Sequence, residues 1–193
     1  MHNSIIVKKK LNRFNKIVKV SGDKSISIRW VLLSSLASGI SRASNLLMSE
    51  DVFAAIKAIK KLGIKVKFNK NVCKIYGKGI DGYKYKKNLV LNAENSGTLG
   101  RLILGFLINT RSPIKLIGDK SLSKRDFKRI SDPLSKFGVN FKLKNNKHLP
   151  MTLCNSTKLT PFTYFENRGS AQCKSAVIFG GMRTEGTTLI KAK

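Results

Sequence analysis

The feature that most constrains the fold is an internal repeat with a period of about 72 to 75 residues. In segment 62–68 an apolar residue and a glycine end a predicted helix, and an alternating strand pattern follows. The same order returns at 137–143. Predicted helices also begin with small polar residues at similar intervals, at Ser25, Thr98 and Ser170. Similarity at a fixed period indicates repeated structural units. We therefore predict repeats over about 21–86, 87–150 and 151–193, the third being incomplete.

Each repeat is predicted to contain a strand, a helix, a strand, a helix and two strands, an α/β (α+β) fold. Helical spacing of apolar residues runs from Ser25 to Ala37, and Gly39 is placed to end that helix. A second helix is expected to turn four apolar side chains inward: Phe53, Ile56, Ile59 and Leu62. Strands are expected from Ile5, at 17–20, at 41–47, and at 64–68 and 73–76 as a hairpin.

The later repeats carry the same signals. A helix over 126–136 is predicted to turn Phe127, Ile130 and Leu134 inward. The third repeat begins a helix near Ser170 and continues with a strand over 186–190.

The stretch Ser21–Arg29 has the composition of an anion-binding helix start. It places Lys24, Ser25 and Arg29 at or near the first turn of the predicted helix. Unpaired backbone N–H groups and the positive end of the helix dipole stabilise phosphate or carboxylate there. The alternative is an ordinary Ser/Asp cap with solvated cations.

The repeat offers three such starts, each with a hydroxyl followed about one turn later by a cation. The pairs are Ser25 with Arg29, Thr98 with Arg101, and Ser170 with Lys174. If the repeats bring these helix N-termini together, they form one anion-binding surface. Three independent caps are the alternative.

Composition narrows the class of protein. The chain has 193 residues, 41% of them hydrophobic, and a formal net charge of +28, which favours capture of anionic ligands. The cysteines Cys73, Cys154 and Cys173 show no paired spacing, which argues against a zinc site and for a reducing compartment. The longest apolar runs are too short to cross a bilayer, and no secretory signal pattern is evident. We expect a cytoplasmic protein without membrane association.

Four ordered blocks resemble the 5-enolpyruvylshikimate-3-phosphate synthase family, within the enolpyruvyl transferase superfamily. The blocks are Gly22-Asp23-Lys24-Ser25-Ile26-Ser27 with Arg29, Asn95-Ser96-Gly97-Thr98 with Arg101, Gly118-Asp119-Lys120-Ser121-Leu122-Ser123-Lys124-Arg125, and Ser170-Ala171-Gln172-Cys173-Lys174-Ser175-Ala176. The resemblance covers nearly all of the chain from about Lys16. It implies domains of threefold βαβαββ repeats and transfer of the carboxyvinyl group of phosphoenolpyruvate to the 5-hydroxyl of shikimate 3-phosphate. It also implies no metal or organic cofactor, and a monomer at full length.

The resemblance also implies roles for individual residues. Shikimate 3-phosphate would be bound by Lys24, Ser25, Arg29, Ser170, Ala171 and Gln172. Phosphoenolpyruvate would be bound by Lys24, Gly97, Arg125 and Gln172, and Gly97 would also influence sensitivity to the inhibitor glyphosate. Asn95, Thr98 and Arg101 are expected to shape and fix their turn. Four departures from the family pattern, Ser21, Ile28, Trp30 and Asp126, remove no expected ligand contact, and Trp30 is expected to pack in the core.

The resemblance further implies that residues 1–20 belong with a second domain and that the acid/base carboxylates lie beyond Lys193. Residues 21–193 would then be a substrate-binding domain, and we expect no turnover from these 193 residues alone. The catalytic residues are therefore not assigned.

Two other functions stay open. A UDP-N-acetylglucosamine enolpyruvyl transferase is disfavoured because members of that branch typically carry a reactive cysteine in the loop corresponding to 118–125, which here has Lys120. A nucleic-acid-binding module would fit the charge, but Lys and Arg form no stripe with interleaved aromatic residues. Instead the aromatic side chains fall on expected inward positions: Phe53, Phe68, Phe127 and Phe141.

Overall fold

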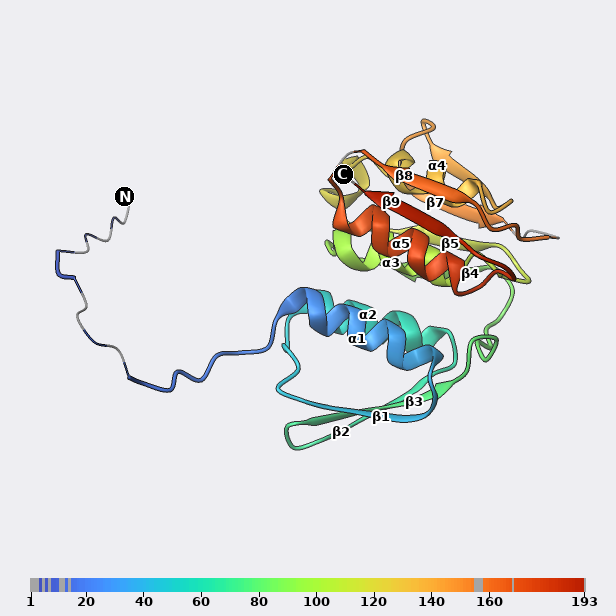
Figure 1. Ribbon diagram of the computed structural model, residues 1–193. Coiled ribbons are helices and arrows are strands. Elements are labelled where there is room, and N and C mark those ends of the chain that lie inside the picture. Colours follow the sequence, from blue (N-terminus) through green and yellow to red (C-terminus); the bar gives the residue numbers. More distant parts are fainter. Residues whose placement is uncertain are drawn as a thin grey trace.

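The computed structural model describes residues 4, 6, 8–10, 13, 15–154, 158–167 and 169–192. In this part of the chain, helices and sheets are mixed in three successive units (Figure 1). The first unit contains α1 (Lys24–Leu36), β1 (Ser38–Ser44), α2 (Glu50–Lys61), β2 (Lys65–Asn69) and β3 (Val72–Lys78). The second contains β4 (Leu89–Asn92), α3 (Gly97–Phe106), β5 (Ile114–Ile117), the short 3-10 helix η1 (Leu122–Lys124), α4 (Lys128–Ser135), β6 (Asn140–Lys144) and β7 (His148–Cys154). The third contains β8 (Thr163–Glu166), α5 (Ala171–Gly181) and β9 (Leu189–Ala192).

The sheets confirm the predicted repeat. The first has the strand order β1-β3-β2 and the second β4-β5-β7-β6, so that β5, β7 and β6 take the places of β1, β3 and β2. In both units the last two strands form an antiparallel hairpin. The second and third units each begin with a parallel pair, β4 with β5 and β8 with β9.

Helix α3 lies at the centre of the core. It packs against α5, and the rings of Phe106 and Phe179 approach to 4.3 Å between centroids. Helices α1 and α2 cover the first sheet and face α3 and α5 across the middle of the molecule (Figure 1). The predicted inward residues Ile56, Ile59 and Leu62 are buried, as are Phe127, Ile130 and Leu134. Trp30 is partly buried against this core, as expected.

Two aromatic predictions are wrong. Phe53 is 39% exposed because α2 turns Val52, Ala55 and Ile59 toward the core instead. Phe68 is 42% exposed because it lies near the end of β2, whereas Val66 on the same face of that strand packs against the core. Helical or alternating spacing gives the faces of an element, but the neighbouring layer decides which face is covered.

The predicted strand over 17–20 does not form among the described residues, and its assignment to a second domain stays a prediction. These residues form no strand, and Ile17 is 97% exposed. β-branched residues favour an extended backbone, but a strand needs a neighbour to accept its hydrogen bonds. The Lys16–Val20 segment instead leads away from the helices and sheets (Figure 1). The expected strand start at Ile5 lies outside the described residues.

One helix boundary also differs from the prediction. Helix α1 ends at Leu36, and Gly39, with φ of 113°, is the second residue of β1 rather than the end of the helix. The strand expected at 41–47 accordingly runs over Ser38–Ser44. None of the described helices is both long and apolar enough to span a membrane.

Candidate anion-binding site

Three side chains cap the helices that open the repeats. Asp23, Ser96 and Ser170 accept hydrogen bonds from the backbone N–H groups of Ile26, Leu99 and Cys173, at 2.7, 3.3 and 3.2 Å. Such N-caps fix where a helix begins and leave other N–H groups of the first turn free for a ligand.

The caps correct the predicted equivalence between the repeats. Ser25 and Thr98 are the second residues of α1 and α3, and the matching residue of α5 is Gln172, not Ser170. The predicted hydroxyl–cation pairs are therefore not equivalent: Ser25 and Thr98 lie inside their helices, whereas Ser170 is an N-cap. The aspartate at position 23 was the missing signal, because aspartate caps helices as well as serine does.

Gln172 joins the starts of α3 and α5. Its Oε1 accepts a hydrogen bond from Arg101 Nη1 at 2.7 Å, and its Nε2 donates to Thr98 Oγ1 at 3.1 Å. The two contacts determine the orientation of the side-chain amide. They also agree with the expectation that Thr98 and Arg101 fix this region.

Arg101 is the most buried arginine of the site and lies 5.7 Å over the ring of Phe127. Burial lowers the pKa of its guanidinium, and the positive charges of Arg129 and Arg125 lower it further. An arginine nevertheless stays protonated in proteins. The start of α3 therefore holds three guanidinium groups within electrostatic reach of one another.

This arginine cluster has unused hydrogen-bonding capacity. The Nε atoms of Arg101 and Arg129 are buried and have no hydrogen-bond partner among the described residues. Arg125 is exposed, and its Nη2 donates to Asn95 Oδ1 at 3.0 Å. Sequence reasoning missed Arg129, which lies in α4, whereas Arg125 precedes that helix in an extended conformation.

Gly97 makes room for two of these arginines. A Cβ atom built on Gly97 would lie 2.9 Å from the Nη1 atoms of both Arg101 and Arg125. Glycine thus allows the guanidinium groups to approach the helix N-terminus closely. Glycine at position 97 therefore has a structural reason, the space for the arginines, in addition to the expected close approach of a ligand.

Helix α1 contributes the remaining predicted residues. Arg29 donates to Ser175 Oγ at 3.3 Å and to the carbonyl oxygen of Ser25 at 3.2 Å, so it bridges the starts of α1 and α5. Lys24 is half exposed and lies 3.8 Å from the Asp51 carboxylate. An exposed pair at that distance is weak, so an anion can compete for the ammonium group.

The last residue of β8 is a buried carboxylate that no sequence pattern singled out. Glu166 is 3% exposed, accepts from the Tyr164 hydroxyl at 2.7 Å and from the Ser170 N–H at 3.4 Å. The second contact joins the end of β8 to the N-cap residue of α5. Among the described residues, no three His, Cys, Asp or Glu side chains gather where they could hold one metal ion.

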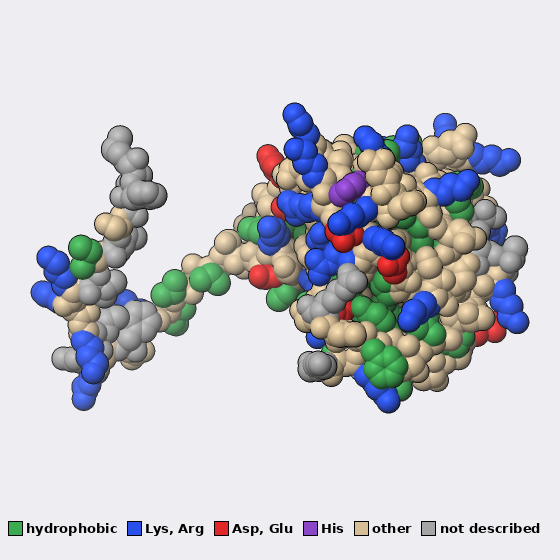
Figure 2. Space-filling model, turned by 90° about the horizontal axis from the view of Figure 1, so that it is seen from above, with side chains coloured by type: hydrophobic (Ala, Val, Ile, Leu, Met, Phe, Trp, Pro, Cys, Tyr) green, Lys and Arg blue, Asp and Glu red, His purple; other side chains and the backbone are tan. Residues whose placement is uncertain are grey.

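The surface around α4 and β8 is rich in cations (Figure 2). Lys and Arg side chains are spread over this face with few acidic ones between them, in keeping with the net charge of +28. Such a field speeds the capture of anions. Repeated α/β units that gather arginines and helix N-termini in this way form a candidate site for small anions.

Comparison with known proteins specifies the family. Residues 8–192 match the family model for EPSP synthase (3-phosphoshikimate 1-carboxyvinyltransferase), and the chain belongs to this family. It is 40% identical over 183 residues to the 3-phosphoshikimate 1-carboxyvinyltransferase of Streptococcus agalactiae, covering 94% of this chain and 43% of the relative. It is 39% identical over 188 residues to that of Ruthia magnifica, covering 97% and 43%.

A solved structure shows the same fold. The EPSP synthase of Acinetobacter baumannii superposes with a TM-score of 0.85 at 30% identity, over 91% of this chain and 40% of that one. The chain thus spans less than half the length of the relatives that it matches.

Proposed function

We propose that this chain binds shikimate 3-phosphate and phosphoenolpyruvate in a cytoplasmic 3-phosphoshikimate 1-carboxyvinyltransferase. In the reaction the 5-hydroxyl oxygen forms a bond to C2 of phosphoenolpyruvate, the bond from C2 to the phosphate ester oxygen breaks, and the hydroxyl proton is balanced by that of the released inorganic phosphate. The arginine cluster around the start of α3, joined to α5 through Gln172, is the observation that carries the proposal. Both substrates bear phosphate and carboxylate groups, which arginines bind with charge-assisted hydrogen bonds.

The proposed roles are those that the family resemblance implies for each residue. Arg125 and Gly97 lie at the start of α3 and would hold phosphoenolpyruvate. The α1 residues Lys24, Ser25 and Arg29 would hold shikimate 3-phosphate. Ser170, Ala171 and Gln172 at the start of α5 would complete that site, with Gln172 and Lys24 also reaching phosphoenolpyruvate.

Calorimetric titration of the purified 193-residue chain tests the proposal. Shikimate 3-phosphate is expected to bind, and phosphoenolpyruvate to bind in its presence, while UDP-N-acetylglucosamine does not. Arg125→Gln should weaken phosphoenolpyruvate binding by about 10-fold or more, the effect of losing a hydrogen bond from a charged group. Arg42→Gln removes an exposed cation on β1 and is the matched control.

Binding of UDP-N-acetylglucosamine in place of shikimate 3-phosphate would overturn the proposed substrate. Equal weakening by Arg125→Gln and Arg42→Gln would mean that only the general positive charge acts. Phosphate release with both substrates, measured on the same sample, tests separately the expectation that this chain does not turn over by itself.

A further inference from the structure

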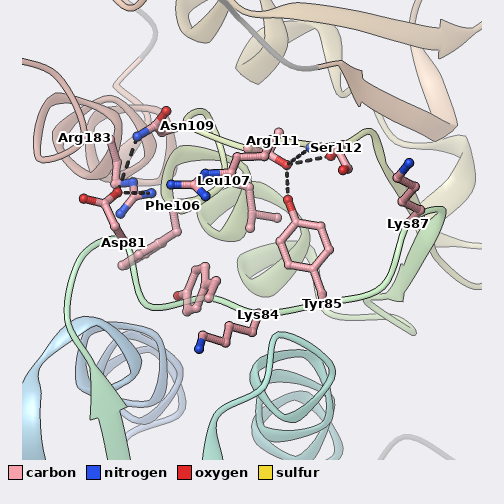
Figure 3. Close-up of a pocket in the computed structure, with 12 residues that line it drawn as sticks. Asp81, Lys84, Tyr85, Lys87, Phe106, Leu107, Asn109, Arg111, Ser112 and Arg183 are labelled. Atoms are coloured by element: carbon pink, nitrogen blue, oxygen red, sulfur yellow. Dashed lines mark hydrogen bonds and ion pairs between the residues drawn. The ribbon is translucent and has the colours of Figure 1, made fainter.

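A cavity of about 670 Å³ lies at the C-terminal end of α3, the end opposite to the arginine cluster. It is lined by the irregular linker between β3 and β4, the turn after α3, and Arg183 from the turn after α5 (Figure 3). Small-molecule sites have volumes of this order. None of the residues expected to bind the substrates lines this cavity.

Arg183 is the most unusual residue of the cavity. Its side chain is only 4% exposed, and Nη2 lies 3.3 Å from Asp81 Oδ1. The Nε and Nη1 atoms are buried without a hydrogen-bond partner among the described residues. Burial lowers the pKa of this guanidinium, and Asp81 opposes that effect. Buried charged donors without partners are costly, so this arrangement requires an explanation.

Asp81 is weakly held in its place. Its side chain is 73% exposed and belongs to the irregular linker. Its second contact, from Asn109 Nδ2, has a length of 3.4 Å, slightly more than the 3.3 Å of the contact with Arg183. Distances of this size are at or beyond the long end of N–H···O hydrogen bonds. An incoming carboxylate or phosphate can therefore displace Asp81 from Arg183.

The remaining lining favours an anion with a flat ring. Lys84, Lys87 and Arg111 add positive charge against the single carboxylate of Asp81. In Figure 3 the Arg111 side chain extends toward the side of the cavity where Asp81 and Arg183 lie.

Two tyrosines supply the walls for the ring. The hydroxyl of Tyr83 bonds to Ser35 Oγ at 2.6 Å, and that of Tyr85 to Thr110. With both hydroxyls occupied, the rings of Tyr83 and Tyr85 remain as surfaces for packing a flat group.

We propose that this cavity is a second binding site, for a small organic anion that carries a flat ring. The carboxylate or phosphate of the ligand replaces Asp81 at Arg183, and the ring lies against Tyr83 and Tyr85. The site is separate from the helix N-termini and does not depend on the proposed function.

The test uses phenyl phosphate as the probe and backbone amide NMR shifts of the 193-residue chain as the readout. Shifts are expected at 81–87, 109–112 and 183. Phenyl phosphate should bind about 10-fold more tightly than inorganic phosphate, since the ring adds buried apolar area. Phenol should not produce these shifts because it lacks the anionic group.

Variants separate binding from a structural role of the ion pair. Asp81→Asn removes the competing carboxylate and should tighten phenyl phosphate binding several-fold, whereas loss of a merely structural ion pair would not. Arg111→Gln should weaken binding about twofold to fivefold, and Arg183→Met should abolish it. Arg42→Gln, away from the cavity, should leave the affinity unchanged.

Several results would overturn the proposal. One is the absence of shifts around the cavity, or shifts confined to the starts of α1, α3 and α5. Others are equal affinities for phenyl phosphate and inorganic phosphate, or no tightening by Asp81→Asn. Arg111 is exposed, so its variant keeps the test valid even if Arg183→Met does not fold.

Discussion

The two ends of α3 both carry buried arginines, but they are built in different ways. At the N-terminal end, Arg101 is held by Gln172, and Gly97 leaves space for guanidinium groups. At the C-terminal end, Arg183 comes from the turn after α5 and contacts an exposed aspartate. The first arrangement arises from a repeated helix start, whereas the second has no counterpart in the repeat pattern.

The comparison shows how the helix dipole enters the two sites. At the N-terminus, free N–H groups and the positive dipole end add to the arginines in attracting an anion. At the C-terminus the dipole stabilises the arginine itself and opposes an anionic ligand. Anion binding there must come from the Arg183 Nη2 group that now contacts Asp81 and from ring contacts, so its affinity should be the lower of the two.

The packing of the two ends predicts the largest effect on stability. A Cβ on Gly105, near the C-terminal end, would lie 2.2 Å from the carbonyl oxygen of Ala176 in α5. Backbone cannot yield as a side-chain end can, so Gly105→Ala should lower the free energy of unfolding by about 3 kcal/mol. Chemical denaturation measures this effect. If Gly105→Ala lowers the free energy of unfolding no more than Gly97→Ala does, the two ends of α3 do not differ in packing as proposed.

A change at Gln172, which links α3 and α5, is predicted to weaken shikimate 3-phosphate binding strongly without lowering stability. Gln172→Glu keeps an acceptor for Arg101 but places negative charge among the site residues. Shikimate 3-phosphate affinity should fall by about 10-fold or more, while the melting temperature stays near that of the parent chain. Titration calorimetry and thermal melting provide the two readouts.

Gln172→Leu is the matched control for this prediction. It removes both hydrogen bonds and leaves Arg101 without its acceptor, so the melting temperature should also fall. Unchanged affinity in both variants would show that Gln172 does not serve the ligand site.

Gly97→Ala should have a smaller effect on folding than Gly105→Ala. The added methyl group meets only the guanidinium ends of Arg101 and Arg125, which can move. We expect a stability loss below about 1 kcal/mol and roughly 10-fold weaker phosphoenolpyruvate binding. In a full-length enzyme the apparent KM for phosphoenolpyruvate should rise accordingly. Unchanged binding would indicate that the displaced arginines do not contact this ligand.

The last prediction concerns Tyr83, beside the C-terminal cavity, and affects folding stability without a change in substrate binding. Burial raises the pKa of Tyr83 to about 12, and the hydrogen bond with Ser35 and the charge of Arg183 partly oppose this rise. The unfolded chain releases this proton near pH 10, so the stability contributed by Tyr83 is intact below pH 10 and is lost as the pH rises toward 12.

Tyrosinate absorbance should therefore show a late step near pH 12 in the folded protein. Tyr83→Phe should remove that step and cost about 1 kcal/mol at neutral pH through the lost hydrogen bond. Trp30 fluorescence, followed in parallel, identifies the pH range in which the chain stays folded. Persistence of the late step in Tyr83→Phe would assign it to another tyrosine.

The sequence by itself determined the repeat, the helices and the hairpins, because these depend on local spacing of apolar residues and on turn residues. The echo of 62–68 in 137–143 was enough to predict two sheets with the same hairpin. The blocks around Lys24, Gly97, Arg125 and Ser170 were likewise found from the chain alone. Their roles in binding the two substrates stay predictions.

Tertiary structure decided what depends on contacts between distant residues. The contact of Gln172 with Arg101 joins positions 71 residues apart, and the pair of Asp81 and Arg183 joins separate turns. Local patterns also could not show that the side chains of Phe53 and Phe68 are exposed. Burial and pairing are set by the neighbouring layer, and the order of residues within one element does not specify that layer.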